Sequence, residues 1–364
     1  MNIRLIHAAD LHLDSPFEGL SEEKAALRRS EQRALLQKLG QIVQEREAQL
    51  VLLSGDLLDS DNAYAETASM LSETLAAVRV PVFIAPGNHD WYSRRSPYAS
   101  LALPENVHIF REAAICPAEL PALRVRVWGA GYTAPSCPDL LSGFTIRKET
   151  GWKDILVLHG HLGAASSPYC PIREEELAAS GADYAALGHV HSYSGLRRAG
   201  NTYYAWPGCA EGRGFDECGQ KGVIFAELSD STCHAELIPI AAREYRVLSV
   251  PVGDDPVESV LRSIPEGAER DIYKIILTGE TNAPVAVSLL RQRLEPYFFA
   301  LRIEDKTVPA VSLSERASEN SLSGIFIRRM LSRIESASDD AERELLQRAL
   351  RYGLAALSNG EAVL

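Results

Sequence analysis

Five short motifs in this sequence place carboxylates, an amide and imidazoles directly after apolar segments. They are Asp10-Leu11-His12, Gly55-Asp56-Leu57-Leu58-Asp59, Gly87-Asn88-His89-Asp90, His159-Gly160-His161 and Gly188-His189-Val190-His191. Residues two apart on an extended segment point to the same side, which places Asp10 beside His12 and His189 beside His191. Each of these pairs can chelate a metal ion.

Taken one at a time, the motifs also have ordinary structural explanations. Asp10 or Asp56 could cap a helix or a turn, Gly87-Asn88 could form a tight turn, and a single histidine after a strand usually contacts only a backbone group. Five motifs with the same setting in one chain favour a metal site instead. We expect structural roles for the three histidines outside these motifs, His7, His108 and His234.

The types of ligand indicate which metal would bind. Carboxylate, amide oxygen and imidazole without thiolate suit Mn²⁺, Fe²⁺ or Zn²⁺, and the candidates outnumber the ligands that one ion needs. We therefore predict two ions bridged by Asp56, because its strand lies between the other contributors. Two ions about 3.5–4 Å apart lower the pKa of a shared water and hold both the attacking and leaving oxygens of a phosphoryl displacement. The predicted chemistry is phosphoester hydrolysis.

The segments that must position these motifs alternate between strands and helices. Helical patterns from Glu22 to Glu47 and from Ala63 to Val78 separate the first three apolar runs. This rhythm predicts an α/β core over residues 1–242. Over residues 243–311, the order strand, helix, strand, helix, strand indicates a smaller α/β domain.

Residues 312–364 are expected to hold a linker and helices. A Ser-rich link is predicted from Ser312 to Ser323. Two amphipathic helices follow, one around GIFIRRMLSRI and one from Asp339 to about Leu357, with Asp339 as N-cap and Asn359-Gly360 as stop signal.

Composition limits the classes of function. The chain has 364 residues, of which 46% are hydrophobic, enough for one large core and a smaller domain. The start of the sequence lacks the apolar run of a signal peptide and no run is long enough to cross a bilayer, so we expect a cytoplasmic protein without a membrane partner. Six cysteines without a CxxC pair indicate neither a zinc knuckle nor a disulfide framework. The net charge of −12 argues against tight nucleic-acid binding by the chain alone.

The order DxH, GDxxD, GNHD, strand-end His and GHxH resembles the calcineurin-like metallophosphoesterases, over about residues 1–240. The resemblance implies a sandwich of two mixed β-sheets flanked by helices. It also implies two sets of metal ligands, Asp10, His12, Asp56 and His191 for one ion, and Asp56, Asn88, His159 and His189 for the other. His89 would protonate or stabilise the leaving oxygen, and Asp90 would orient His89.

Two further residues are candidates for contacts beyond the ligand sets. If its segment stays extended, His161 lies on the same side as His159. We assign the metal to His159, which directly ends an apolar run, and expect His161 to support the ligands or to touch substrate. Arg213, in a Gly-rich loop, could bind a phosphate or could equally be a solvated turn residue.

Finer details resemble the SbcD-like DNA repair exonucleases, and among them the YhaO-like branch. The segments HAADLHLDSPF, GNHD and AWPGCAEGRGFDECGQKG carry this likeness, together with the small α/β domain after the core. It implies a Mn²⁺-dependent exonuclease, 3′ to 5′, that also cuts single strands or hairpins. The second domain would cap the active site and contact DNA, core helices would form a homodimer, and the C-terminal helices would bind an SbcC-like ATPase of the SMC/ABC type. Cys209 departs from the family pattern, which often has a small hydroxyl residue there.

Two alternatives remain from the sequence. The same site could hydrolyse small nucleotides, other phosphodiesters or phosphoproteins. Alternatively, the chain could be a scaffold that regulates an ATPase, although nothing in a scaffold requires a ligand at every expected position.

Overall fold

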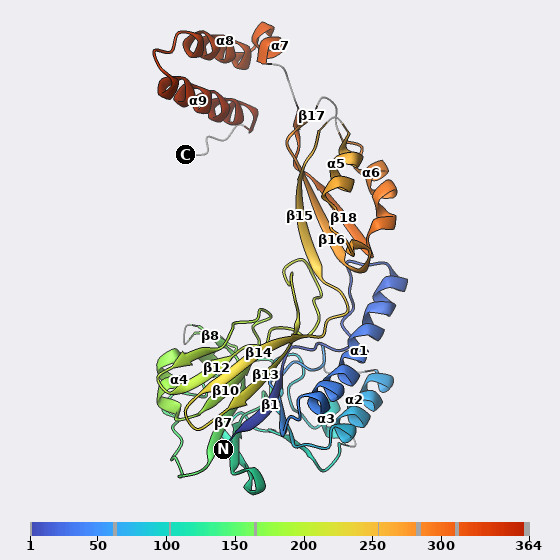
Figure 1. Cartoon of the computed structure of the whole chain (residues 1–364), viewed down its shortest axis with the longest axis vertical. Coiled ribbons are helices and arrows are strands. Elements are labelled where there is room, and N and C mark those ends of the chain that lie inside the picture. The colour runs from blue at the N-terminus through green and yellow to red at the C-terminus, as the bar shows by residue number, and fades with distance from the viewer. Residues whose placement is uncertain are drawn as a thin grey trace. The chain divides into compact units, whose positions relative to one another are not determined.

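A computed structural model describes residues 2–60, 64–101, 103–163, 166–253, 255–281, 285–309 and 313–359. The chain separates into two compact units. The first comprises Met1–Val247, Gly267–Lys274 and Tyr297–Leu301, and the second comprises Leu248–Glu266, Ile275–Pro296 and Arg302–Leu364. Figure 1 follows the elements along the chain.

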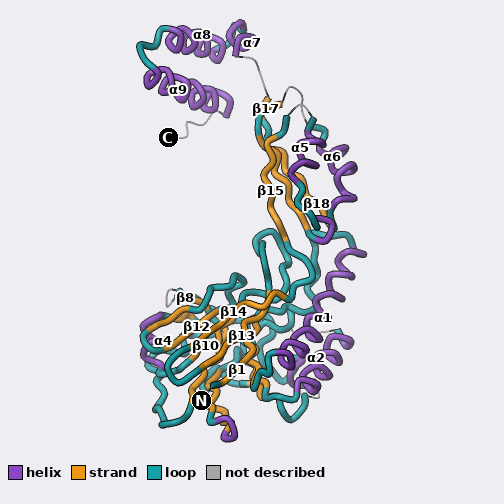
Figure 2. Tube along the Cα trace, viewed as in Figure 1, coloured by secondary structure: helices purple, strands orange, loops and turns teal. Residues whose placement is uncertain are grey.

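The first unit contains two six-stranded sheets, whose strands are drawn in orange in Figure 2. In spatial order, the first sheet consists of β14 (Cys233–Pro239), β13 (Gly222–Leu228), β1 (Ile3–Ala8), β2 (Leu50–Leu53), β3 (Val82–Ile84) and β4 (Val107–Ile109). Strands β1 to β4 are mutually parallel, with Ile6 opposite Val51 and Val51 opposite Val82. Strand β13 is antiparallel to both β1 and β14.

The second sheet is also mixed. Its order is β11 (Arg197–Ala199), β12 (Thr202–Ala205), β10 (Tyr184–Gly188), β7 (Lys153–His159), β6 (Val125–Gly129) and β5 (Cys116–Leu120). Strands β6, β7, β10 and β12 run parallel, whereas the edge strands β5 and β11 are antiparallel to their neighbours. Parallel strands buried on both faces need continuous apolar sequences, which explains runs such as Ile155–Leu158.

Alternating side chains of these strands build separate layers of core. Leu5 and Leu52 point between the two sheets, where they join a cluster with Val157 and Ala186 of the second sheet. The alternate residues of the first sheet pack with helices α1 (Glu22–Glu45) and α2 (Ala65–Val78). Helix α4 (Glu174–Ser180) packs on the outer face of the second sheet. The result is the expected sandwich, two mixed sheets flanked by helices.

Short elements complete the first unit. They are the helix α3 (Pro97–Ser100), the strand pair β8 (His161–Leu162) and β9 (Pro171–Ile172), and the 3₁₀ turns at Pro121–Leu123 and Ala268–Arg270.

The C-terminal part of the chain has the predicted alternation. A three-stranded sheet is formed by β15 (Tyr245–Pro251), β16 (Ile272–Thr278) and β18 (Ala300–Asp305), with helices α5 (Pro256–Ser263) and α6 (Val287–Leu294) between them in sequence. A 3₁₀ turn, Glu295–Tyr297, follows α6, and a small parallel pair is formed by β17 (Glu280–Thr281) and β19 (Val308–Pro309). Three helices come last, α7 (Leu313–Ser318), α8 (Leu322–Glu335) and α9 (Asp340–Asn359).

The predicted Ser-rich link is wrong in part, because Ser321 caps a helix and other serines of the segment lie within helices. Ser321 accepts a hydrogen bond from the Gly324 backbone and starts α8, and α7 lies inside the predicted link. Asp339 accepts from the Glu342 backbone at 2.8 Å, as an N-cap does. The predicted stop at Gly360 and the predicted helix start at Ala63 lie outside the described residues. None of the helices that are described is long and apolar enough to span a membrane.

Candidate metal centre

The five motifs leave the strand ends of both sheets. Asp10, Asp56 and Asn88 follow the adjacent parallel strands β1, β2 and β3. His159 ends β7, and His189 follows the neighbouring parallel strand β10. Carboxyl ends of parallel strands share one edge of a sheet, which is where ligands bind in such folds. The sandwich therefore gathers groups from distant parts of the sequence.

The backbone at these positions is unusual. Asp10, His12 and Asp56 have positive φ values of 50°, 44° and 51°. Backbone hydrogen bonds hold this geometry, from Asp10 N to Gly55 O at 3.0 Å and from His12 N to Asp56 O at 2.9 Å. Strained backbone in non-glycine residues persists where surrounding structure over-determines it and is concentrated at functional sites.

Two glycines allow the loops to approach closely. A Cβ at Gly87 would lie 2.2 Å from Oδ1 of Asp56, and a Cβ at Gly188 would lie 1.8 Å from the Ser54 carbonyl oxygen. Any side chain at either position would push the candidate ligands apart. Space, more than turn geometry, explains why the GNHD motif begins with glycine.

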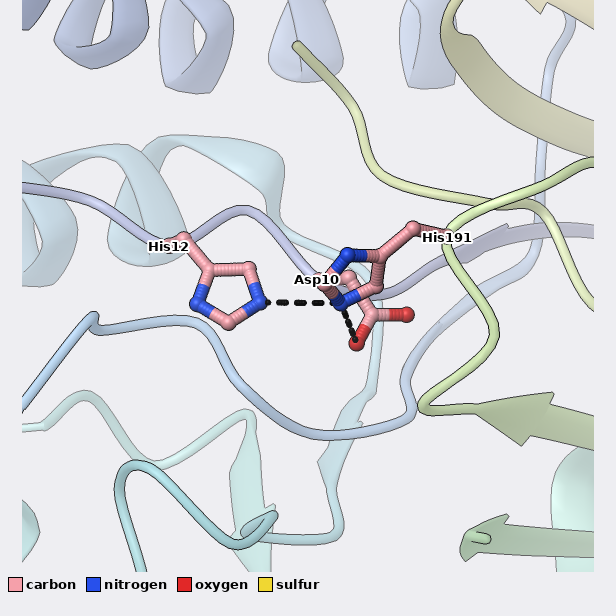
Figure 3. Close-up of side chains that lie close together, drawn as sticks. All are labelled: Asp10, His12 and His191. Atoms are coloured by element: carbon pink, nitrogen blue, oxygen red, sulfur yellow. Dashed lines mark hydrogen bonds and ion pairs between the residues drawn. The ribbon is translucent and has the colours of Figure 1, made fainter. Parts of the chain in front are cut away.

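The first group of candidate ligands consists of Asp10, His12 and His191, and Figure 3 shows their side chains pointing toward one another. Nε2 of His191 lies 3.3 Å from Nε2 of His12 and 3.6 Å from Oδ1 of Asp10. Nδ1 of His12 donates to Asp59 at 3.1 Å, and Nδ1 of His191 donates to Glu217 at 2.6 Å. Both Nε2 atoms therefore present lone pairs to the same small space.

The second group is built around Asp56 and His159. Oδ2 of Asp56 lies 3.3 Å from Nε2 of His159, and the same nitrogen lies 3.0 Å from Oδ1 of Asn88. Nδ1 of His189 lies 3.1 Å from this Asn88 oxygen. His159 donates its Nδ1 hydrogen to the Ser54 carbonyl at 2.8 Å, which turns Nε2 toward Asp56 and Asn88. Oδ2 of Asp56 is also 3.9 Å from Nε2 of His12, which places Asp56 between the two groups.

Burial controls the protonation of these groups. It lowers the pKa of His12 to about 4 and that of His189 to about 3, which keeps both imidazoles neutral at pH 7. Burial also raises the pKa of Asp10 to about 7. Burial opposes the charge on His159, but Asp56 overcomes it and raises the pKa of His159 to about 9.

These observations fit a cation. Three sets of carboxylate and imidazole atoms, Asp10 with His12 and His191, His12 with Asp56 and His89, and Asp10 with Asp56 and His159, each lie within 4.8 Å of one another. Lone pairs that face each other without a hydrogen between them repel, and a positive ion removes that repulsion. Neutral imidazole and ionised carboxylate are the forms that bind metal, so a bound ion would displace the proton that the raised pKa leaves on His159.

His89 stands apart from the buried groups because its side chain is exposed. Its Nδ1 donates to the carbonyl oxygen of Asp59 at 3.0 Å, and its ring lies edge-on to that of His12 at 4.8 Å between centroids. Among the described residues the second ring nitrogen makes no hydrogen bond, and the ring lies beside the candidate ligands His12 and Asp56.

The prediction that Asp90 orients His89 is wrong. The Asp90 carboxylate accepts hydrogen bonds from the backbone amides of Asp56, Leu57, Leu58 and Gly87 and from the Tyr98 hydroxyl. Within the described residues it makes no hydrogen bond to the His89 side chain. Asp90 is fully buried. Its carboxylate organises the loop that carries Asp56, because it accepts the hydrogen bonds of that loop's backbone amides.

Arg213 has a different setting from the one expected. Its guanidinium donates to the carboxylates of Asp59 and Glu217, both at 2.9 Å, so it already has two anionic partners and is not a solvated turn residue. Asp59 and Glu217 are the carboxylates that hold His12 and His191. Sequence reasoning assigns no role to either. Asp59 ends the GDLLD motif, but nothing in the sequence connects Glu217 with a histidine 26 positions away.

His161 lies beside the centre. Its ring is 5.2 Å from that of His189, and Tyr169, which sequence reasoning misses, lies 5.1 Å from the same ring. The Nδ1 atom of His161 is buried and has no hydrogen-bond partner among the described residues. His159 occupies the ligand group, where the strand-end argument places it, and His161 lies next to it.

Comparison with known proteins decides the family. The model of the calcineurin-like phosphoesterase family matches residues 3–193, more than half of the chain. The chain belongs to the calcineurin-like phosphoesterase family. Members of this family use a dinuclear metal centre, and the structure supplies candidate groups for it.

Within this family the chain is similar to several curated proteins. An uncharacterized metallophosphoesterase, YhaO of Bacillus subtilis (strain 168), is 29% identical over 310 residues, 81% of this chain and 73% of that protein. The SbcD component of the nuclease SbcCD from the same organism is 31% identical over 111 residues, 29% of this chain and 27% of that protein. The DNA double-strand break repair protein Mre11 of Aeropyrum pernix is 24% identical over 297 residues, 76% of this chain and 70% of that protein. The family resemblance expected from the motifs is confirmed.

Proposed function

We propose that this phosphoesterase is a Mn²⁺-dependent DNA exonuclease that works from 3′ to 5′ and also cuts single strands or hairpins. The observation that carries the proposal is an exposed imidazole, His89, beside a buried group of carboxylates, amide and imidazoles at the strand ends. Relatives named as part of a nuclease and as a DNA break repair protein support DNA as the substrate.

The proposed ligands divide between the two ions. Asp10, His12, Asp56 and His191 hold one, and Asp56, Asn88, His159 and His189 hold the other. Asp56 would contribute to both sites, as its position 3.3 Å from His159 and 3.9 Å from His12 supports. Divalent ions held there supply positive charge and activate water for attack at phosphorus.

The chain's own residues then handle the leaving group. The Asp59 carbonyl holds the Nδ1 hydrogen of His89 and so fixes both the tautomer and the direction of the ring. When both ring nitrogens of His89 are protonated, the nitrogen that faces away from Asp59 donates its proton to the 3′ oxygen as the P–O bond breaks, and the ring is left neutral with Nδ1–H still bound to Asp59. Asp90 contributes by holding the loop of Asp56.

The net charge of −12 opposes DNA binding by the chain alone. We propose that metal ions, a homodimer and an SbcC-like ATPase supply the positive charge and the binding surface for DNA that the chain alone lacks. Residues 243–311 would be a capping domain that contacts DNA. Helices α8 and α9 share a core of Ile327, Met330, Leu346 and Leu350, while Leu322, Leu345 and Tyr352 are 71%, 62% and 75% exposed. These exposed side chains support docking of a coiled coil.

A gel assay tests the function. Full-length protein with Mn²⁺ and a 5′-labelled linear duplex is expected to give a ladder that shortens from the 3′ end. The ladder should vanish with chelator and with His89→Ala. Turnover of a small phosphodiester without DNA cleavage, even when the ATPase partner is added, would instead assign the site to small nucleotides or phosphoproteins.

A further inference from the structure

Histidines of the two proposed metal sites differ in what supports them. His12 and His191 donate their outer hydrogens to carboxylates, those of Asp59 and Glu217, at 3.1 and 2.6 Å. His159 donates to a neutral backbone carbonyl, that of Ser54. The ring of His189 lies 5.2 Å from that of His161 and 5.1 Å from that of Tyr169, and no carboxylate in the described part of the chain accepts a hydrogen bond from it.

A single arginine joins the two supporting carboxylates. Nη1 of Arg213 donates to Oδ1 of Asp59, and Nη2 donates to Oε1 of Glu217, both at 2.9 Å. The Arg213 backbone N–H donates to the other oxygen of Glu217 at 2.7 Å. A planar guanidinium suits this bridging because its donors are held in a fixed fork. We call Asp59, Arg213 and Glu217 the clamp.

The clamp carries a net negative charge. Two carboxylates face one guanidinium, so that one negative charge remains behind His12 and His191. The Glu217 carboxylate accepts hydrogen bonds from His191 at 2.6 Å and from Arg213 at 2.9 Å. A carboxylate that accepts the outer hydrogen of a histidine makes the inner nitrogen a stronger electron donor and fixes its direction.

Part of the clamp comes from outside the segment that defines the family. The family match ends at residue 193, whereas Arg213 and Glu217 lie in the loop that precedes β13. The same loop is tied to the site elsewhere, because Nζ of the buried Lys221 donates to the His191 carbonyl oxygen at 2.8 Å. This loop therefore supports the candidate site that contains His191.

We propose that the clamp makes the site of Asp10, His12, Asp56 and His191 the tighter of the two, so that it fills first and the site of Asn88, His159 and His189 fills second. Asp59, Arg213 and Glu217 are positioning residues, since they act through the histidines. The inference rests on the proposed dinuclear centre and concerns its order of loading. It does not depend on DNA being the substrate.

Calorimetry and electron paramagnetic resonance test the order on full-length, chelator-stripped protein titrated with Mn²⁺. The first equivalent is expected to bind at least about tenfold more tightly than the second and to give the spectrum of isolated Mn²⁺. The second equivalent should convert that spectrum to the one of a spin-coupled pair. Asn88→Ala should remove the weaker event and leave the tighter one unchanged.

The clamp is tested by Glu217→Gln, which should weaken the tighter event by about 10- to 100-fold, the usual effect of removing such support, and leave the weaker one within about threefold. Asp216→Asn is the matched control, because Asp216 is the exposed carboxylate next in sequence, and it should change neither event. Arg213→Lys, which keeps the charge but lacks the fork, should retain more of the tight affinity than Arg213→Ala.

Thermal unfolding of the metal-free variants separates this role from a general loss of structure. Glu217→Gln should unfold within a few degrees of the wild type and still lose affinity. Two equal affinities in the wild type would overturn the proposal, as would loss of the tighter event in Asn88→Ala, or an unchanged tight affinity in Glu217→Gln. No Mn²⁺ binding at all would instead refute the metal centre, and failure to cut DNA with both events present would refute the proposed substrate alone.

Discussion

The carboxylate of Asp90 lies 2.7 Å from the backbone nitrogen of Leu57, although the two residues are 33 positions apart. The same carboxylate receives the amides of Asp56 and Leu58 and that of Gly87. One buried acid thus ties the loop after β3 to the loop after β2. Its neighbour His89 points elsewhere, to the Asp59 carbonyl. Adjacent residues of the GNHD motif therefore serve different purposes, one structural and one proposed to be chemical.

Asp90→Asn should destabilise the fold and weaken metal binding together. An amide cannot accept all the hydrogen bonds that the carboxylate accepts, and a buried unsatisfied donor costs about 1–3 kcal/mol. We expect a loss of about 3 kcal/mol in the free energy of unfolding, measured by urea denaturation, with a weaker Mn²⁺ affinity. Tyr98→Phe, which removes one donor to Asp90 at 2.5 Å, should cost less than Asp90→Asn. A fully stable Asp90→Asn protein that only lost activity would restore the catalytic role that the sequence predicts.

His89→Ala and Asp56→Ala should separate chemistry from metal binding. His89 is exposed and is not needed for either proposed ligand set, so its alanine variant should keep two equivalents of Mn²⁺ and lose turnover by about 10²- to 10⁴-fold. Asp56 lies between the two groups, and its alanine variant should lose metal. The measurement is metal content by elemental analysis beside phosphodiester turnover. Equal metal loss in the two variants would make His89 a ligand instead.

Removal of metal should lower the stability of the whole centre. Lone pairs of His12 and His191 face each other at 3.3 Å, and the buried carboxylates of Asp10 and Asp56 lie in the same space. A ligand that binds only the folded state at 100 times its dissociation constant stabilises a protein by about 2.7 kcal/mol. We therefore expect a rise of several degrees in the unfolding temperature with Mn²⁺ and its reversal by chelator, followed by differential scanning fluorimetry. The double variant Asp10→Asn, Asp56→Asn should show no such rise.

How far the sequence predicts this site depends on where each residue's partners are. The candidate ligands can be found because their strands end at them, and neighbouring parallel strands share an edge, so that Asp10, Asp56 and Asn88 are placed together by the sequence alone. Glu217 cannot be found this way. It reaches His191 through the fold of an irregular loop whose path no periodic pattern records. The role of Asp90 is missed for a related reason. Most of its hydrogen-bond donors are backbone amides, and because nearly every residue has one, the sequence does not show which of them will reach Asp90.

Helix boundaries show the same limit on a local scale. The sequence predicts that helix α1 starts at Glu22, and it does, because Ser21 accepts from the Lys24 backbone and marks the start. The serines before α8 predict a link, although Ser321 caps that helix in the same way. Serine favours both loops and caps. A cap can be recognised only when the helix that it begins is recognised first.

The buried His7 should make stability depend on pH. His7 contacts the Tyr184 hydroxyl at 3.0 Å and the Ser54 hydroxyl at 2.7 Å, and burial lowers its pKa from 6.5 to about 3. Between these values the unfolded chain binds a proton that the folded chain does not, so the free energy of unfolding falls as the pH falls from about 6.5 toward 3. One proton corresponds to about 1.4 kcal/mol per pH unit. Above pH 6.5 this effect vanishes.

His7→Gln tests that assignment, since glutamine is polar but does not titrate in this range. All four tryptophans, Trp91, Trp128, Trp152 and Trp206, belong to the first unit, so their fluorescence reports its unfolding. Urea denaturation of chelator-treated protein at pH 5.0, 6.0 and 7.5 should show a pH slope that is smaller by about one proton in the variant. Parallel slopes would mean that other groups cause the dependence.

His161 should affect substrate binding more than turnover. Its Nδ1 is buried without a hydrogen-bond partner among the described residues, and its ring lies beside that of the proposed ligand His189. A phosphate oxygen is the acceptor that this nitrogen lacks, and a hydrogen bond to a charged group contributes about 1.5–3 kcal/mol. His161→Ala should therefore raise KM about 10-fold or more and change kcat by less than about threefold, with Mn²⁺ binding retained. A variant that lost one equivalent of Mn²⁺ would show His161 to be a ligand, and the assignment of His159 as the metal-binding histidine of this segment would then have to be reversed.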